Sequence, residues 1–242
     1  MINYHDRPGD TDNHENIIAA LERRDHMAVI ELLEMPLSIL ETLSPFMQEP
    51  FPTLTELDIY GESMADWVLP ETSLSGSAPL LRRCAICGVL FLALPSFLIS
   101  TFQITDLTLT GVAEIPPEQM ATCLTALPNL KELVMAFDFL CTIDYPCFLN
   151  PPPLTRVDLP LLTHFKFEGF SQYLEELVAR IYAPFLHRLF VNFVIEPDIS
   201  ESQFQFYQFI ARSERLKEFH RATIDFNPWL FSWPMDWEVI SS

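Results

Sequence analysis

The chain of 242 residues carries 33 acidic side chains against 14 lysines and arginines, which gives a net charge of −19 and a pI near 4.5. This charge argues against a nucleic-acid partner, whose phosphates are met by lysine and arginine, and against an anionic membrane surface. Hydrophobic residues make up 49% of the chain, which excludes disorder by composition. A basic protein partner is compatible with the charge, although an acidic surface more often serves solubility alone.

Residues 1–25 are predicted to form a flanking segment whose helix caps a repeat array. Asp12 or Asn13 is suited to cap the start of that helix. Its inward-facing residues are expected to be Ile17, Ile18 and Leu21. Residues 1–16 are polar and lack the apolar core of a secretory signal, so the expected compartment is the cytoplasm or the nucleus.

From residue 26 to residue 226 a phrase of the form Leu-x-x-Leu-x-Leu returns about every 25 residues, which is typical of leucine-rich repeats. The clear copies are Leu54-Leu57-Ile59, Leu81-Cys84-Ile86, Ile104-Leu107-Leu109, Leu130-Leu133-Met135 and Leu162-Phe165-Phe167. Weaker copies are Met27-Ile30-Leu32, Leu186-Leu189-Val191 and Leu216-Phe219. The pattern predicts an α/β leucine-rich-repeat solenoid of about eight coils, a curved horseshoe with a parallel β-sheet on the concave face and helices on the convex face.

The segments between the phrases are expected to return the chain to the next strand, several of them as helices. Residues 118–127 follow a Pro-Pro pair and have apolar side chains at helical spacing, as do residues 171–182. A proline-rich stretch near 138–160 is interpreted as an insertion in one coil. The tail from 227 to 242 gathers aromatic residues without a repeat phrase. It is expected either to cover the last coil or to expose apolar surface to a partner.

Residues 84–105 carry no charge and are long enough to span a bilayer. Gly88, Pro95 and the match to the repeat phrase favour a buried coil instead, with a strand at 81–87 and a helix around 95–101. We therefore expect no membrane partner.

The sequence offers no pattern for catalysis, a metal or a cofactor. Cys84 and Cys87 have the spacing of a redox or zinc motif, but alternation along a strand sends them to opposite faces. No second cysteine or histidine pair lies at zinc-finger spacing, and no nucleotide-binding or hydrolase motif is found. Neighbouring carboxylates such as Glu175 and Glu176 are expected on a solvated face. The prediction is a protein that is not an enzyme, with reduced thiols.

Strand alternation also predicts which side chains point towards the concave face, where solenoids bind their partners. Aromatic and arginine side chains are the usual anchors of protein interfaces. The candidate protein-binding residues are Asp58, Tyr60, Arg83, His164, Lys166, Arg188 and Phe190. The alternative is that these positions are tolerated surface without a partner.

Several runs of sequence are distinctive beyond the repeat phrase. They are Asn13-His-Glu-Asn-Ile-Ile-Ala-Ala-Leu-Glu, Phe51-Pro-Thr-Leu-Thr-Glu-Leu, Leu74-Ser-Gly-Ser-Ala-Pro-Leu-Leu-Arg, Ala93-Leu-Pro-Ser-Phe-Leu-Ile-Ser-Thr and Tyr173-Leu-Glu-Glu-Leu-Val-Ala-Arg-Ile. Together they resemble the F-box-associated leucine-rich-repeat proteins of mushroom-forming fungi, over residues 8–220.

That resemblance implies a client-binding role in substrate recognition, with a Skp-type adaptor and a cullin as further partners if an F-box accompanies the repeats. No F-box is recognised in the sequence. The alternatives are a stand-alone scaffold or competitor that binds the same clients, a truncated non-functional copy, or a fragment.

Overall fold

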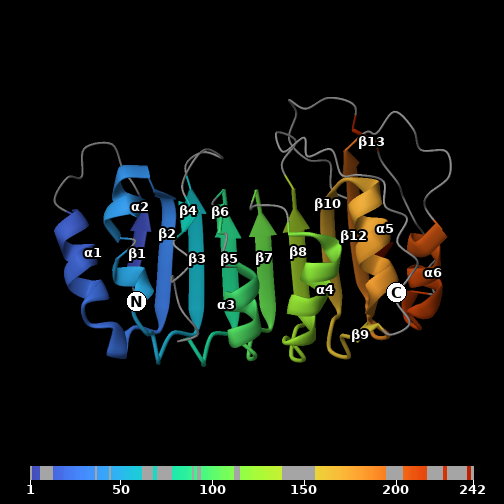
Figure 1. Cartoon of the computed structure of the whole chain (residues 1–242), viewed down its shortest axis with the longest axis horizontal. Helices are drawn as coiled ribbons and strands as arrows, with labels where there is room; N and C mark the ends of the chain where they lie inside the picture. The colour runs from blue at the N-terminus through green and yellow to red at the C-terminus, as the bar shows by residue number, and fades with distance from the viewer. Residues whose placement is uncertain are drawn as a thin grey trace. The chain divides into compact units, whose positions relative to one another are not determined.

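The repeat phrase forms neighbouring strands of a parallel sheet in the computed structural model, so the predicted α/β class is confirmed (Figure 1). The chain divides into two compact units, Met1–Ala113 and Glu114–Ser242, each described here by itself. The structure describes residues 2–5, 13–35, 37–43, 45–61, 68–69, 78–88, 90–91, 94–111, 115–137, 156–194, 204–216, 226–227 and 239–240.

In the first unit the strands follow one another across the sheet in the order of the sequence, each parallel to its neighbour. They are β1 (Ile2–His5), β2 (Val29–Met35), β3 (Glu56–Gly61), β5 (Arg83–Cys87) and β7 (Asp106–Thr110). The helices are α1 (Asn13–Leu21), α2 (Leu37–Leu43) and α3 (Leu94–Ser100), with short 3-10 helices η1 (Arg24–His26) and η2 (Phe46–Gln48). A separate two-stranded sheet joins β4 (Val68–Leu69) to β6 (Leu90–Phe91).

The second unit repeats this arrangement with strands β8 (Glu132–Ala136), β10 (His164–Gly169) and β12 (Arg188–Val194), parallel and in sequence order. Its helices are α4 (Pro117–Thr125), α5 (Ser171–Arg180) and α6 (Phe204–Arg212). Strand β9 (Val157–Asp158) pairs with β11 (Ile181–Tyr182). Two segments near the end of the chain pair with β12, namely β13 (Phe226–Asn227) in parallel and β14 (Val239–Ile240) in antiparallel orientation.

The strand registers align one phrase with the next. The middle residue of each phrase lies beside the middle residue of the following phrase, and all of these side chains are buried. They are Leu57, Cys84 and Leu107 in the first unit and Leu133, Phe165 and Leu189 in the second. Burying such a side chain stabilises the fold by about 1.5–3 kcal/mol, which makes the phrase the main source of the core.

A tight turn precedes the strands β3, β5, β7, β8, β10 and β12, which carry the clearest phrases and the copy at Leu186. The N–H of the leucine that opens a phrase donates to the carbonyl three residues earlier, as from Leu54 to Phe51 at 3.2 Å. The same bond joins Leu81 to Ala78, Ile104 to Thr101, Leu130 to Leu127, Leu162 to Leu159 and Leu186 to Ala183. Proline follows the first residue of most of these turns, and its fixed φ favours that position. An apolar-Pro-x-Leu motif is therefore a second repeat signal, and it was not among the predictions.

Directly after each turn, backbone bonds tie one strand to the next. In the first unit Thr55 N–H donates to the Ala28 carbonyl at 2.8 Å, and Arg82 N–H donates to the Thr55 carbonyl at 2.8 Å. Thr105 N–H continues the series to the Arg82 carbonyl at 2.7 Å. The hydroxyl of Thr105 adds a side-chain bond to the same carbonyl at 3.1 Å. These bonds satisfy backbone groups at the strand starts, where an unpaired buried group would be costly.

The predicted helices are confirmed with small shifts of their ends. The helix expected over 118–127 is α4, which begins at Pro117 and ends at Thr125, and the helix expected around 95–101 is α3, at residues 94–100. Helix α5 begins at residue 171 as expected but ends at Arg180, and the next two residues are extended. Residues 13–21 form α1, in which Ile17 and Leu21 are buried whereas Ile18 is partly exposed.

The first strand was expected near residue 27, and the structure corrects this because β1 precedes it at Ile2–His5. Ile2–His5 carries no repeat phrase, so the periodicity could not reveal it. The described part of residues 84–105 contains most of β5, together with β6 and α3, and no helix in the described ranges is long and apolar enough to cross a membrane. Some predictions fall outside the described residues. They concern residues 138–155 of the proline-rich insertion, with Cys141 and Cys147, the phrase at Leu216-Phe219 beyond Leu216, and tail residues 228–238.

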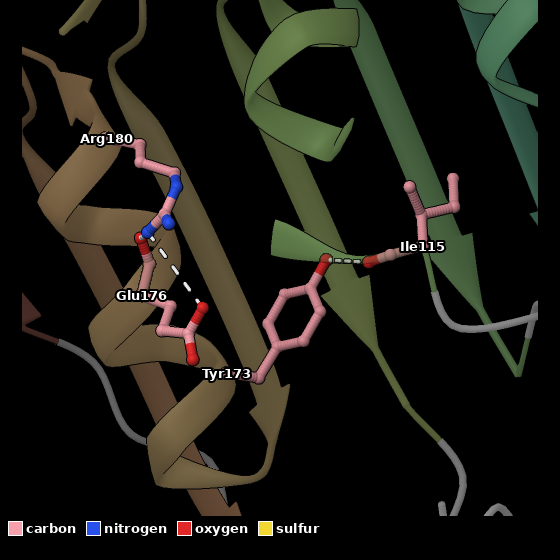
Figure 2. A network of polar contacts seen from close by, with 4 residues as sticks. All are labelled: Ile115, Tyr173, Glu176 and Arg180. Atoms are coloured by element: carbon pink, nitrogen blue, oxygen red, sulfur yellow. Dashed lines mark hydrogen bonds and ion pairs between the residues drawn. The ribbon is translucent and has the colours of Figure 1, made fainter. Parts of the chain in front are cut away.

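An aromatic cluster holds α5 of the second unit against its strands. The Tyr173 ring lies 4.5 Å from the ring of Phe137 and stacks on Phe167, with 6.0 Å between the ring centroids. Its hydroxyl donates to the Ile115 carbonyl at 2.8 Å, and Figure 2 shows this bond beside the Glu176–Arg180 pair of the same helix. A Cβ at Gly169 would lie 3.1 Å from both Phe137 and Phe167, so glycine lets the cluster close.

Glu175 joins α5 to α6. Its carboxylate accepts the N–H of Gln205 at 2.7 Å and the N–H of Phe206 at 3.1 Å, at the start of α6. The residue is only 7% exposed, which corrects the expectation that Glu175 and Glu176 share a solvated face. The four N–H groups at the start of a helix have no partner within that helix, and here a side chain of the neighbouring helix supplies one.

Candidate functional site

Each unit has a sheet face that turns away from its helices. In the first unit Leu57, Ile59 and Ile86 are buried on the helix side, whereas their sequence neighbours point to the opposite side. We call that side the open face of the first unit. Its residues are Glu31, Glu56, Asp58, Tyr60, Arg83, Ala85, Cys87, Asp106, Thr108 and Thr110.

Asp58 lies near the middle of this open face, between Glu31 and Ala85 in the neighbouring strands. Alternation places it on the predicted side, but its neighbours leave the residue only 8% exposed. One carboxylate oxygen, Oδ2, lies 3.6 Å from Nη2 of Arg83, whose side chain is 57% exposed. The other oxygen, Oδ1, is buried and has no hydrogen-bond donor among the residues that the structure describes.

The environment of Asp58 disfavours its negative charge. Burial raises the pKa of this carboxyl above its ordinary value of 3.8. The nearby Arg83 guanidinium acts in the opposite direction, and the carboxylates of Glu31 and Glu56 raise the pKa further. The charge on Asp58 is thus only partly compensated by the residues that the structure describes.

Tyr60, Cys87 and Thr110 lie side by side across three strands of the open face. Burial raises the pKa of Tyr60 to about 12, with further contributions from Cys87 and Asp58. Burial also raises the pKa of the Cys87 thiol, although hydrogen bonds with Thr110 and Tyr60 act against it. Both side chains are therefore neutral at physiological pH.

Cys84 lies on the helix side, fully buried, and burial raises the pKa of its thiol as well. The alternation that separates Cys84 from Cys87 is thereby confirmed. Thiols held in the protonated form are weak nucleophiles and weak metal ligands. Among the residues with described side chains, no group of three or more histidine, cysteine or acidic residues could hold a metal ion.

The open face of the second unit has a different chemistry. We define it by Glu132, Val134, Ala136, His164, Lys166, Glu168, Arg188, Phe190 and Asn192, which form three rows across β8, β10 and β12. The Lys166 ammonium lies 4.9 Å from the centre of the Phe190 ring, a cation–π contact worth about 0.5–1 kcal/mol at an exposed site. His164 Nδ1 shares a hydrogen bond with the Thr163 hydroxyl at 2.8 Å.

The predicted binding residues thus fall into two groups. Asp58, Tyr60 and Arg83 lie on the open face of the first unit, where the structure brings the Asp58 carboxylate and the Arg83 guanidinium together. His164, Lys166, Arg188 and Phe190 lie on the open face of the second unit, where His164 is beside Arg188 and Lys166 is beside Phe190. The preference for aromatic and arginine anchors left out Glu31, Glu56 and Asp106, which share the first of these faces.

No known protein family has a model that matches this sequence, and comparison with curated proteins also gives no match.

The raised pKa of Asp58 predicts that Asp58→Asn increases stability at neutral pH, by about 1 kcal/mol or less because the attraction between Asp58 and the exposed Arg83 guanidinium is lost at the same time. A pKa raised by folding means that the folded state binds the proton more tightly, so the cost of the charge is present above the folded pKa. That cost disappears as the pH falls below 3.8, where both states are protonated. Urea denaturation of both proteins from pH 3 to pH 7 measures the difference. A variant less stable than the wild type at pH 7 would contradict this reading.

Proposed function

We propose that the chain is a leucine-rich-repeat solenoid that acts as a non-enzymatic protein-binding module. Its partners bind to the open faces of the two units. The observation that carries the proposal is the contrast between the two sides of the strands. One side supplies the buried core, whereas the other presents aligned rows of charged, aromatic and polar side chains. Repeat proteins use extended surfaces of this kind to bind their partners.

The aligned phrases and the recurring turn support the solenoid, because successive repeats within each unit make the same backbone bonds. The resemblance to F-box-associated repeat proteins supports the client-binding role. In this role the repeats bind a client protein, and an F-box, where one is present, binds a Skp-type adaptor and through it a cullin. A scaffold or competitor that works without the ligase uses the same faces.

Affinity purification of the tagged full-length protein from its native cells, with quantitative mass spectrometry, tests the proposal. The informative variant is Tyr60→Ala with Phe190→Ala, which removes one aromatic anchor from each open face. The matched control is Ile99→Ala with Tyr207→Ala, because these side chains lie on α3 and α6 and are 52% and 57% exposed. Thermal melting establishes that both variants remain folded.

The open-face variant is expected to lose a specific partner by about fivefold or more, since an aromatic anchor contributes over about 1 kcal/mol, while the control retains it. Recovery of an adaptor and a cullin would identify a ligase receptor. A client recovered without them would identify a stand-alone scaffold. Equal recovery with both variants would refute binding through the open faces.

A further inference from the structure

We propose that the open face of the first unit binds a basic segment of a protein partner, whose lysine or arginine displaces Arg83 and pairs with Asp58. This inference rests on the proposed protein-binding function and adds the chemistry of the partner.

The open face of the first unit carries an excess of negative charge. Four acids, namely Glu31, Glu56, Asp58 and Asp106, share it with one cation, Arg83. Glu31 lies directly opposite Asp58 in the neighbouring strand, and like charges in that position repel each other. Charge complementarity therefore favours a cationic partner at this face.

Among these acids, Asp58 is the one expected to bind the cation of the partner. The residue is 8% exposed, and its Oδ1 finds no hydrogen-bond donor within the described part of the chain. A carboxylate has room for several donors, and a guanidinium can bond both of its oxygens at once. The raised pKa of Asp58, caused first by burial, agrees with a carboxylate that its described neighbours compensate incompletely.

Arg83 is suited to give way to an incoming cation. Its guanidinium lies 3.6 Å from Asp58 Oδ2, yet 57% of its side chain is exposed. The exposed guanidinium is hydrated on its outer side, and its distance from Oδ2 exceeds that of a close hydrogen bond, so Arg83 can turn into solvent at low cost. Tyr60 follows Asp58 on the same face and stays neutral, and an aromatic ring beside carboxylates is a favourable place for a lysine or arginine.

A side-chain cation fits this face better than a metal ion. Within the described side chains, the acids of the open face do not form a group that could hold a metal. They are spread along three strands, which suits an extended segment that crosses the strands.

Selection of random dodecapeptides displayed on phage against the immobilised full-length protein provides the probe. The enriched peptide is then synthesised, and its Kd is measured by fluorescence anisotropy. The open-face variant combines Glu31→Gln, Glu56→Gln and Asp58→Asn. The control variant, Glu22→Gln with Glu41→Gln and Glu214→Gln, removes as many charges from exposed positions elsewhere. Arg83→Gln and its neighbour Arg82→Gln, also exposed, form a second matched pair.

The expected peptide contains lysine or arginine. Its Kd is expected to rise at least about tenfold for the open-face variant and less than about twofold for the control. Arg83→Gln is expected to lower the Kd several-fold because the competing cation is gone, whereas Arg82→Gln leaves it within about twofold. Thermal melting of each isosteric variant checks that the fold is intact.

Three results would overturn the inference. A basic peptide bound equally by the open-face variant and its control would mean general attraction to an acidic chain. A peptide without lysine or arginine that is lost on Phe190→Ala would overturn this inference but leave the proposed protein-binding function standing. Absence of any enriched peptide, together with equal partner recovery in the affinity purification, would count against both.

Discussion

Replacing Tyr173 with alanine is expected to lower the free energy of unfolding by about 3–5 kcal/mol. The side chain is 5% exposed, and its ring packs between those of Phe137 and Phe167. Alanine would leave a cavity between α5 and the strands and would also leave the Ile115 carbonyl without its hydroxyl donor. Urea denaturation followed by circular dichroism measures the change.

Two further variants separate the ring from its hydroxyl. Tyr173→Phe keeps the packing and removes only the bond to Ile115, so a loss of about 1 kcal/mol is expected. Tyr207→Ala removes an exposed tyrosine from α6 and should change stability by no more than about 0.5 kcal/mol. Equal losses for Tyr173→Ala and Tyr207→Ala would contradict the described position of Tyr173 in the core.

Replacing Glu175 with alanine is expected to destabilise the protein by about 1–3 kcal/mol, because the N–H groups of Gln205 and Phe206 lose their acceptor. Glu176→Ala is the matched control on the same helix. Its carboxylate lies 4.0 Å from the Arg180 guanidinium, which is buried but also donates to the Glu176 backbone carbonyl at 2.8 Å. That bond remains in the variant, so a loss of about 1 kcal/mol or less is expected, smaller than the loss for Glu175→Ala. Denaturation monitored by circular dichroism compares the two variants.

Glu175→Gln tests whether the bond or the charge matters. Burial raises the pKa of Glu175, while the N–H groups of Phe206 and Gln205 act against that rise. The negative charge of Glu175 therefore lowers the free energy of unfolding at a pH above its pKa in the folded state. Glutamine accepts the same N–H groups without this charge, so Glu175→Gln should keep most of the stability at pH 7. Glutamine as harmful as alanine would show that the carboxylate itself is required.

The strands could be predicted because their signal is local and periodic. Leucine-like residues at fixed spacing located β3, β5, β7, β8, β10 and β12, and a proline pair located the start of α4. The proline that recurs in the turns was visible in the sequence as well, since Pro52 and Pro79 each precede a phrase by the same interval. Strand β1 lacks the phrase, and only its pairing with β2 reveals it.

The candidate site was harder to predict because burial depends on neighbours from other repeats. Alternation assigns Asp58 to the open face, but Glu31 and Ala85 in adjacent strands decide how much of it solvent reaches. Glu175 resembles a surface residue beside Glu176, and only the position of α6 turns it into a cap. Sequence periodicity gives the direction of a side chain, whereas its partners come from the packing of distant segments.

The bonds that link Thr55, Arg82 and the Ala28 carbonyl have a consequence for how such a chain can change in length. The backbone N–H groups of Thr105 and Asp106 donate to the Arg82 carbonyl. In the same way, the N–H groups of Arg82 and Arg83 donate to the Thr55 carbonyl. Removing residues 82–104 would bring the N–H groups of Thr105 and Asp106 to the Thr55 carbonyl and restore the same pairing. A chain built in this way can gain or lose whole repeats by recombination and keep these backbone hydrogen bonds between neighbouring strands. Loss of part of a repeat would leave the donors and acceptors of two neighbouring strands out of register.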